Sequence, residues 1–513
     1  MKNLILCLSI VGLTLFSGCK AKKEPLLEAK PEDHRISFKF VQLNDVYEIA
    51  PLSGGAYGGM ARVAHIYDSI KAAEPNTYLF LAGDFLNPSL LGNLKYQGER
   101  IRGKQMVEVM NAMDFELVTF GNHEFDIDEE PLQQRLNESE FYWSSANVFQ
   151  QTADGPRVFH MVKEGDSIPV PETYVIHMED ADGTKADIGL FGVCIPSNPR
   201  DFVYYADIFT EANTAVVGLE MQAVDAIVGL THLTIEQDTQ LAKNHPQIPL
   251  IMGGHEHYNM NVRVGNTRIT KADANAKTIY VHTFDLDTRS GALSVSSNLV
   301  SVDDKIKEKP SVKAVVDKWD AVLMSELKTV VDDPLEQVYL ADPPLDGKDI
   351  PSRSEQTNLG ALITASMAAG FEEPTTLAFV NGGSIRIDDE LDGPVLAMDI
   401  FRVLPFGGHV LKVEMTGALL IRTLEYGRNS IGTGAYLQRY GFERTQDGQW
   451  MANGAIIDDD MVYAVAMSDF LMRGLDIPFL KEGAEGLVSV IEPKEDEPAA
   501  DIRKAIIHYL KSQ

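Results

Sequence analysis

The stretch Leu117-Val118-Thr119-Phe120-Gly121-Asn122-His123-Glu124-Phe125-Asp126 decides the fold of the first half of the chain. Its first four residues are branched or aromatic, which is typical of a short buried strand. Polar side chains follow this strand at once, from Asn122 onward. Ligands in α/β sheets collect at the carboxyl ends of strands, so the stretch predicts both a strand and a site at its end.

The same arrangement recurs throughout residues 36–302. Polar clusters follow four other predicted strands: Asn44-Asp45-Val46-Tyr47 after Ile36–Leu43, Gly83-Asp84 after Tyr78–Ala82, Thr231-His232 after Ala226–Leu230, and Gly253-Gly254-His255-Glu256-His257 after Leu250–Met252. A further strand is predicted at Asp187–Val193, and helices at Gly59–Ala73, Gly103–Met113 and Thr214–Ala223. Alternating strands and helices predict a layered α/β domain.

The residue types in these clusters indicate metal chemistry. Asp, Asn and His are suitable ligands for divalent ions of the Mn, Zn or Fe class. One Asp after a strand is usually a turn former, and one His is usually structural. An ordered set with every member at a strand end favours a metal site, and the intervening glycines let the backbone approach it closely.

The order of these motifs resembles that of the calcineurin-like metallophosphatases, and Asn122 to Asp126 resembles their 5′-nucleotidase branch. The resemblance implies an α/β/β/α domain that holds two metal ions bridged by Asp84. It implies that the other ligands are Asn122, His232 and His255 for one ion, and Asp45 and His257 for the other. It also implies that His123 meets the phosphoryl group while Asp126 holds its imidazole.

Tyr47 departs from the family pattern, which has Asp-x-His where this chain has Asp45-Val46-Tyr47. Tyrosine ligates as phenolate, and ionising it at pH 7 costs about 4 kcal/mol. Water or Glu48 is one alternative ligand, and a trivalent iron that offsets the cost is another. We therefore predict a weakened or unusual first metal site with activity retained.

The second half is predicted to be a smaller α+β domain over residues 334–513, after a linker helix over 303–333. A helix is predicted at Asn358–Ala369, and strands near Thr376–Val380 and Val410–Met415. Its motifs are Ser352-Arg353, Asn381-Gly382-Gly383-Ser384-Ile385-Arg386, Leu404-Pro405-Phe406-Gly407 and Phe470-Leu471-Met472-Arg473-Gly474-Leu475-Asp476. Aromatic rings on such loops can stack on a base, and arginines can bind phosphate oxygens.

These motifs resemble the C-terminal domain of 5′-nucleotidases. The resemblance implies a nucleotide site in which Phe406 and Phe470 stack on the base, Asn381 contacts it, Asp476 holds the ribose, and Arg353 and Arg386 surround the phosphate. Leu475 replaces a family glycine and is expected to reshape the ribose or base pocket. The resemblance also implies an active site between the domains, where ligand sites are common.

The N-terminal segment predicts export. Lys2 and the apolar run Leu4–Phe16 are typical of a signal peptide, and Ser17-Gly18-Cys19 resembles a lipoprotein cleavage site. We expect residues 1–19 to form this signal, Cys19 to carry a lipid anchor in the bacterial envelope, and residues 20–34 to form a flexible tether before the domain at 35–302. The alternative is ordinary cleavage nearby, with Cys19 incidental.

Composition narrows the function further. A net charge of −30 disfavours nucleic-acid binding, and it requires local positive charge, from metals or arginines, to hold a nucleotide. Cys194 is the one cysteine left after the signal, which excludes a disulfide framework. We predict extracytoplasmic hydrolysis of nucleoside 5′-monophosphates. Alternatives are a nucleotide-sugar pyrophosphatase or cyclic-nucleotide phosphodiesterase, and a nucleotide-binding lipoprotein decayed at Tyr47.

Overall fold

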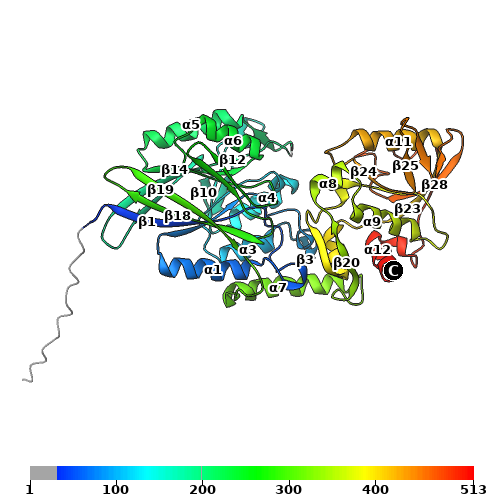
Figure 1. Ribbon diagram of the computed structural model, residues 1–513, viewed down its shortest axis with the longest axis horizontal. Helices are drawn as coiled ribbons and strands as arrows, with labels where there is room; N and C mark the ends of the chain where they lie inside the picture. The colour runs from blue at the N-terminus through cyan, green and yellow to red at the C-terminus, as the bar shows by residue number, and fades with distance from the viewer. Residues whose placement is uncertain (1–31, 198) are drawn as a thin grey trace, which may run out of the picture.

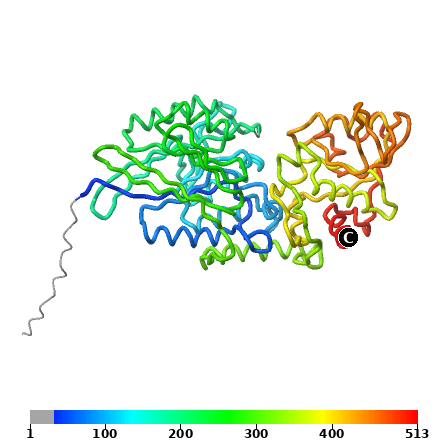
Figure 2. Tube along the Cα trace, viewed as in Figure 1, coloured from blue at the N-terminus to red at the C-terminus, as the bar shows by residue number. Residues whose placement is uncertain are grey.

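The computed structural model describes residues 32–197 and 199–513 and shows two domains side by side (Figure 1). The predicted signal segment, Cys19 and most of the predicted tether lie outside these residues. Across the described part of the chain, no helix is both long and apolar enough to cross a bilayer. The N-terminal part of the chain forms one domain and the C-terminal part forms the other, which carries the C-terminus (Figure 2).

Two six-stranded sheets, counted over the described residues, form the first domain. The first sheet contains, in spatial order, β19 (Ala292–Ser301), β18 (Thr278–Asp287), β1 (Arg35–Leu43), β2 (Thr77–Ala82), β5 (Leu117–Thr119) and β6 (Tyr142–Ser144). The second contains β11 (Thr173–Glu179), β12 (Lys185–Cys194), β14 (Ala226–His232), β15 (Leu250–Gly253), β17 (Thr267–Lys271) and β16 (Met260–Val264). These bounds confirm the predicted strands.

The two sheets pack face to face through an aromatic and aliphatic core. Phe38 and Phe284 stack with ring centroids 4.6 Å apart, and Phe40 and Phe80 lie beside them. Ile188 and Leu190 of the second sheet belong to the same buried cluster. Such alternating inward positions explain why sequences with a two-residue period form this sandwich.

Helices cover the outer faces, which gives the predicted α/β/β/α order (Figure 1). The first sheet is covered by α1 (Met60–Ala73), α3 (Lys104–Asn111) and α7 (Pro310–Leu327), and the second by α5 (Ile208–Met221) and α6 (Ile235–Asn244). Helix α4 (Glu129–Glu138) packs beside α3. The helix expected at Thr214–Ala223 begins six residues earlier, because Asp207 caps the Thr210 amide.

Helix α7 is shorter than the segment predicted for it. It covers Pro310–Leu327, whereas helix was expected over 303–333. Pro310 stands at its first turn, where proline is tolerated because no intrahelical N–H is needed. Buried Trp319 donates its indole N–H to Glu108 of α3 at 3.0 Å, so this helix packs on the first domain.

A mixed five-stranded sheet, counted over the described residues, organises the second domain. Its spatial order is β24 (Leu437–Tyr440), β21 (Ala378–Asn381), β28 (Val462–Ser468), β23 (Val410–Thr416) and β29 (Leu487–Ile491). Helices α9 (Asn358–Ala369) and α12 (Ile502–Leu510) pack together, and α11 (Gly417–Asn429) packs with a separate cluster around Leu420. The helix predicted at Asn358–Ala369 is confirmed.

Smaller elements lie between the domains and at their edges. β20 (Gln337–Asp346) pairs with β22 (Glu390–Leu396) where the domains meet, followed by α8 (Asp349–Ser354) and α10 (Ala397–Val403). Peripheral strands are β3 (Lys95–Tyr96), β4 (Glu99–Arg100), β7 (Val148–Thr152), β8 (Gly155–Arg157), β9 (His160–Lys163), β10 (Asp166–Pro169), β13 (Val203–Tyr205), β25 (Phe442–Arg444), β26 (Trp450–Ala452) and β27 (Ala455–Ile456). Short helices are α2 (Leu90–Asn93), η1 (Ser53–Gly55), η2 (His123–Asp126), η3 (Gly382–Ser384) and η4 (Pro498–Ala500).

Candidate metal centre and nucleotide site

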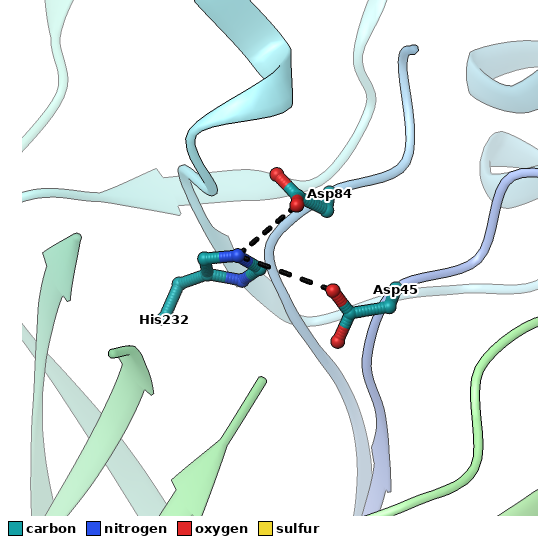
Figure 3. A group of neighbouring side chains, drawn as sticks. All are labelled: Asp45, Asp84 and His232. Atoms are coloured by element: carbon teal, nitrogen blue, oxygen red, sulfur yellow. Dashed lines mark ion pairs between the residues drawn. The ribbon is translucent and has the colours of Figure 1, made fainter. Parts of the chain in front are cut away.

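The carboxyl ends of parallel strands from both sheets meet at one place. β1, β2 and β5 are mutually parallel neighbours, as are β12, β14 and β15. Asp45 follows β1, Asp84 follows β2, and His232 ends β14. Figure 3 shows these three side chains pointing toward one another, as the sequence predicted for a shared site.

Their ligand atoms form a compact, buried group. Potential donor atoms of Asp45, Asp84 and His232 all lie within 4.8 Å of one another, and each residue is at most 1% exposed. His232 Nε2 is 3.1 Å from Asp84 Oδ2 and 3.9 Å from Asp45 Oδ1. Within the described residues, Asn122 Oδ1 is buried without a hydrogen-bond partner, while Asp45 Oδ1 and His232 Nε2 meet only ionisable neighbours of the same group. Buried polar atoms normally have partners, so this donor set fits a metal ion.

Fixed contacts orient the two histidines of this group, which differ in charge: burial opposes the charged His232 ring, but the Asp84 and Asp45 carboxylates outweigh it and raise the pKa of His232 to about 9. The Nδ1–H of His232 donates to the Ala82 carbonyl at 2.8 Å, which leaves Nε2 facing the carboxylates. The His255 ring lies edge-on to His232, with centroids 5.4 Å apart. Burial lowers the pKa of His255 to about 4, so its ring is neutral at pH 7. The His255 amide donates to Asp45 at 2.9 Å.

The backbone around the centre adopts costly conformations. Asp45, Asp84 and His255 have φ values of 53°, 59° and 84°. A left-handed conformation at a non-glycine residue costs about 1–3 kcal/mol and is typical of functional sites. Gly121 lies so close that a Cβ would sit 2.1 Å from Asp84 Oδ1, and one on Gly254 would sit 2.2 Å from the Ala82 carbonyl. Larger residues would therefore displace the ligands.

Glu124, to which the sequence assigned no role, fixes two of these loops. Its buried carboxylate accepts N–H groups from Asp84 at 2.9 Å, Phe85 at 2.7 Å, Leu86 at 3.0 Å and Gly121 at 2.6 Å. One carboxylate thus joins the loop after β2 to the loop after β5. The sequence shows Glu124 inside the motif Asn122 to Asp126, but it does not show which backbone amides its carboxylate binds.

Tyr47 lies inside the centre, beside the remaining predicted ligands. Its hydroxyl is 3.3 Å from Asp84 Oδ2 and 3.2 Å from His257 Nε2, and the same nitrogen is 3.3 Å from Asp45 Oδ1. Burial, together with the Asp84 and Asp45 carboxylates, raises the pKa of Tyr47 well above its usual value. Glu48 points elsewhere, with Oε1 3.9 Å from Arg402 Nε.

His123 and Asp126 form the expected pair next to the centre. His123 Nδ1 is 2.7 Å from Asp126 Oδ2, which also accepts Asn87 Nδ2 at 2.9 Å. The His123 amide donates to Asp84 Oδ1 at 2.8 Å, so the pair is tied to the metal cluster. Burial opposes the charged imidazole, but Asp84 and Asp126 outweigh it and raise the pKa of His123.

Buried Lys271 holds the turn that carries His255 and His257. Its ammonium is fully buried, pairs with Asp238 at 2.9 Å and with Glu256, and donates to the Leu233 carbonyl at 2.6 Å. Glu256 lies between the two histidines and also accepts the Ile235 amide at 2.7 Å. Burial disfavours the ammonium, but the two carboxylates outweigh it and raise the pKa of Lys271.

In the second domain, Asn381 and Asp476 form one cluster. Asn381 Nδ2 donates to Asp476 Oδ2 at 2.7 Å, and Ser384 Oγ donates to Asn381 Oδ1 at 2.6 Å. Burial raises the pKa of Asp476 above its usual value. Leu475, beside it, is 67% exposed. Two motifs far apart in sequence therefore meet, as the resemblance implied.

The predicted phosphate and base residues lie nearby but are less closely joined. The Arg386 guanidinium is 5.7 Å from the centre of the Phe406 ring, which is 58% exposed, and 3.8 Å from Asp126 of the first domain. Arg353 pairs with Asp349 at 2.7 Å. Phe470 is partly exposed. The structure thus brings Arg386 to the His123–Asp126 pair across the domain interface.

A small cavity between the domains lies beside the metal cluster. Both domains line it, and the lining includes Tyr47, Ser89, Asn275, Arg386 and Arg402. Asn275 was not predicted: its Oδ1 accepts the Tyr47 amide at 3.0 Å, but no local motif marks it.

The comparisons with known proteins agree with this geometry. Residues 38–259 match the calcineurin-like phosphoesterases, which places the chain among the metal-dependent phosphoesterases, and residues 339–482 match the 5′-nucleotidase C-terminal domain. The chain therefore combines a calcineurin-like phosphoesterase domain with a 5′-nucleotidase C-terminal domain, and its relatives include proteins named 5′-nucleotidase. A family of this kind implies divalent metal ions, with Asp45, Asp84 and His232 as a candidate site.

Individual relatives support the same assignment. The chain is 28% identical over 460 residues to the trifunctional nucleotide phosphoesterase YfkN of Bacillus subtilis, covering 80% of this chain but 30% of that protein. It is 27% identical over 482 residues to human 5′-nucleotidase, covering 82% and 78%. The 5′-nucleotidase precursor of Thermus thermophilus shares the fold, with TM-score 0.67, 22% identity and coverage of 93% and 96%.

Proposed function

We propose that the protein hydrolyses nucleoside 5′-monophosphates to nucleoside and phosphate outside the cytoplasm. The observation that carries this proposal is the meeting of three groups at the interface between the two domains. These are the buried Asp45–Asp84–His232 cluster, the His123–Asp126 pair tied to it, and Arg386 from the second domain. A carboxylate-rich cluster alone would repel a nucleotide, so metal ions and arginine are needed to attract it.

We assign the metal-binding role to the two sets implied by the sequence. Asp84, Asn122, His232 and His255 would hold one ion, and Asp45, Asp84 and His257, with Tyr47 beside them, the other. Bound ions of this class supply charge neutralisation for the phosphate and lower the pKa of water from 15.7 to about 7. The unpartnered Asn122 oxygen supports the first set, and the contact between Asp45 and His257 supports the second.

The protein's own groups then orient the substrate and its leaving oxygen. With Nδ1 held by Asp126, His123 presents Nε2 to the phosphoryl group and can stabilise charge on the ester oxygen. Arg386, close to Asp126, is placed to bind a phosphate oxygen. Phe406 and Phe470 would stack on the base, Asn381 would contact it, Asp476 would hold the ribose, and Arg353 would add positive charge near the phosphate.

The proposal is tested by identifying the products that the purified protein forms: inorganic phosphate from a monophosphate, UMP and a sugar phosphate from a UDP-sugar, or a nucleoside monophosphate from a cyclic nucleotide. AMP and other nucleoside monophosphates, a UDP-sugar, a cyclic nucleotide and ribose 5-phosphate are each offered with Mn²⁺, Zn²⁺ or Fe. We expect metal-dependent hydrolysis that is fastest with a nucleoside monophosphate. Preference for the UDP-sugar or the cyclic nucleotide would replace the substrate class, and nucleotide binding without turnover would identify a decayed enzyme.

Removing the stacking ring of Phe406 should weaken substrate binding selectively. Base stacking on an aromatic ring contributes about 1–3 kcal/mol, so Phe406→Ala is expected to raise KM for AMP about 5- to 150-fold. KM for ribose 5-phosphate, which has no base, should not change. An equal rise in KM for AMP and for ribose 5-phosphate would show that Phe406 does not contact the base.

The Tyr47→His substitution should tighten the first metal site. Histidine avoids the cost of about 4 kcal/mol for ionising tyrosine at pH 7, and recovering a third of it is about tenfold in affinity. Titration of the metal-free protein with Mn²⁺ or Zn²⁺ measures this, with Tyr57→His as the control because Tyr57 is 51% exposed. Two tightly held ions of one divalent metal in the wild type would contradict a weakened site.

Export and lipid anchoring at Cys19 are part of the proposal. They are supported by the apolar segment Leu4–Phe16 and by the sequence Ser17-Gly18-Cys19. Incorporation of a labelled fatty acid that disappears in Cys19→Ser would be the expected result. Unchanged labelling, or none in the wild type, would reject the anchor.

A further inference from the structure

One short segment of the second domain reaches into the first. Residues 385–389 join η3 to β22, and three of them form ion pairs with the first domain. Arg386 approaches Asp126, Asp389 pairs with Lys277, and Asp388 pairs with Nδ1 of His257. The Asp388 contact differs from the other two because its partner is a proposed metal ligand.

His257 is held from both sides of its ring. Nε2 faces the metal cluster, 3.3 Å from Asp45 Oδ1 and 3.2 Å from the Tyr47 hydroxyl. Nδ1 faces the Asp388 carboxylate. Both side chains are nearly buried, with 18% and 19% of their surfaces exposed. A carboxylate on the far nitrogen of a ligating histidine orients the ring and makes it a better ligand.

The second domain fixes this carboxylate independently of His257. Asp388 Oδ1 accepts the Asp349 amide at 2.6 Å, at the start of α8. Its backbone has φ 45°, a left-handed conformation in which aspartate and asparagine are favoured over most residues. The carboxylate therefore arrives at His257 with its direction set whenever the domains are docked, and it leaves when they separate.

We propose that Asp388 is a positioning residue that couples metal binding at the first site to docking of the two domains. The inference rests on the proposed function, since it requires Asp45 and His257 to bind an ion. Because coupling between two equilibria is reciprocal, docking should tighten this site, and an ion bound there should favour docking. Losing such an orienting partner typically costs about 10- to 100-fold in metal affinity.

The test compares Asp388→Asn with Asp389→Asn in the full chain. Asparagine suits the left-handed backbone but removes the charge facing His257, whereas Asp389→Asn removes the neighbouring ion pair with Lys277 and leaves His257 untouched. Metal-free proteins are titrated with Mn²⁺ or Zn²⁺ by calorimetry. We expect Asp388→Asn to weaken one of the two sites about 10- to 100-fold. The other site should stay near wild type, and Asp389→Asn, which weakens docking but keeps the carboxylate at His257, should weaken the first site much less than Asp388→Asn does.

Two further measurements separate a specific effect from general damage. In a His257→Ala background, the effect of Asp388→Asn on metal affinity should disappear, because both substitutions act through the same ring. X-ray scattering should show that the metal makes the wild type more compact, and that Asp388→Asn loses this response. Thermal melting of the metal-free variants verifies folding.

The outcomes distinguish this inference from the proposed function. Two ions bound equally tightly by Asp388→Asn and wild type would overturn the coupling and leave the proposed function intact. An unchanged Asp388→Asn effect in the His257→Ala background would also overturn it. Failure of the wild type to bind any ion would overturn the ligand assignment itself.

Discussion

Replacing His123 with alanine is expected to lower kcat for AMP about 10²- to 10⁴-fold, the usual contribution of a positioned acid–base group. The Asp126 carboxylate at 2.7 Å holds Nδ1, so the opposite ring nitrogen is available to the ester oxygen. Alanine removes this group and leaves every proposed metal ligand in place. Steady-state kinetics and metal analysis together should therefore show slow turnover with unchanged metal content.

A second histidine–aspartate pair provides a matched control for this substitution. His177 Nδ1 is also 2.7 Å from a carboxylate, that of Asp187, but the two side chains are 76% and 50% exposed on strands β11 and β12. His177→Ala should leave kcat unchanged. If His123→Ala lowers kcat no more than His177→Ala does, the role assigned to His123 is wrong.

Replacing Lys271 with methionine is expected to lower the free energy of unfolding by about 3–5 kcal/mol, as for other broken buried ion pairs. Methionine fills similar space but leaves the Asp238 carboxylate, which is fully buried, without its cation. It also frees Glu256, which holds the turn between His255 and His257. Urea unfolding followed by tryptophan fluorescence measures the loss, and metal titration should show weaker binding.

The control is Lys313→Met on helix α7. Lys313 pairs with Asp317 at 2.6 Å, but both side chains are exposed, at 43% and 57%. Such an exposed pair contributes about 0.3–0.5 kcal/mol. Similar small losses for both variants would mean that the buried network around Lys271 does not stabilise the domain.

Much of the first domain could be predicted because its signals are local. Each strand is a short apolar run, and a polar cluster follows it directly. This cluster indicates the position of the site within the same stretch of sequence. Parallel strands bring their carboxyl ends to one edge, so Asp45, Asp84 and His232 could be placed together before any contact was known. The pairing of His123 with Asp126, three residues apart, was implied by the family resemblance.

The supporting residues could not be predicted, because their partners are distant in sequence. Lys271 meets Asp238 and Glu256, and Asn275 meets the Tyr47 amide 228 residues away. Asp388 reaches His257 only through the docking of two domains. No periodicity or motif marks such contacts, since they depend on the tertiary arrangement.

Strand β20 was missed for a different reason. Its sequence contains Pro343 and Pro344, and proline lacks the N–H that a sheet ladder needs. The strand forms because it pairs with β22 in a two-stranded sheet. Each strand of such a sheet has an unpaired edge, and proline is tolerated there because no N–H is needed. Tertiary context thus overrides the local preference at the point where the two domains meet.

The carboxylate of Glu124 determines how the loops around the metal centre unfold. Four amides from two loops converge on this one side chain, so neither loop can open while the other stays closed. The aspartate proposed to bridge the ions and the histidine proposed to face the phosphate therefore share one local unfolding unit. Heat or denaturant should therefore release these two loops together, in one cooperative step.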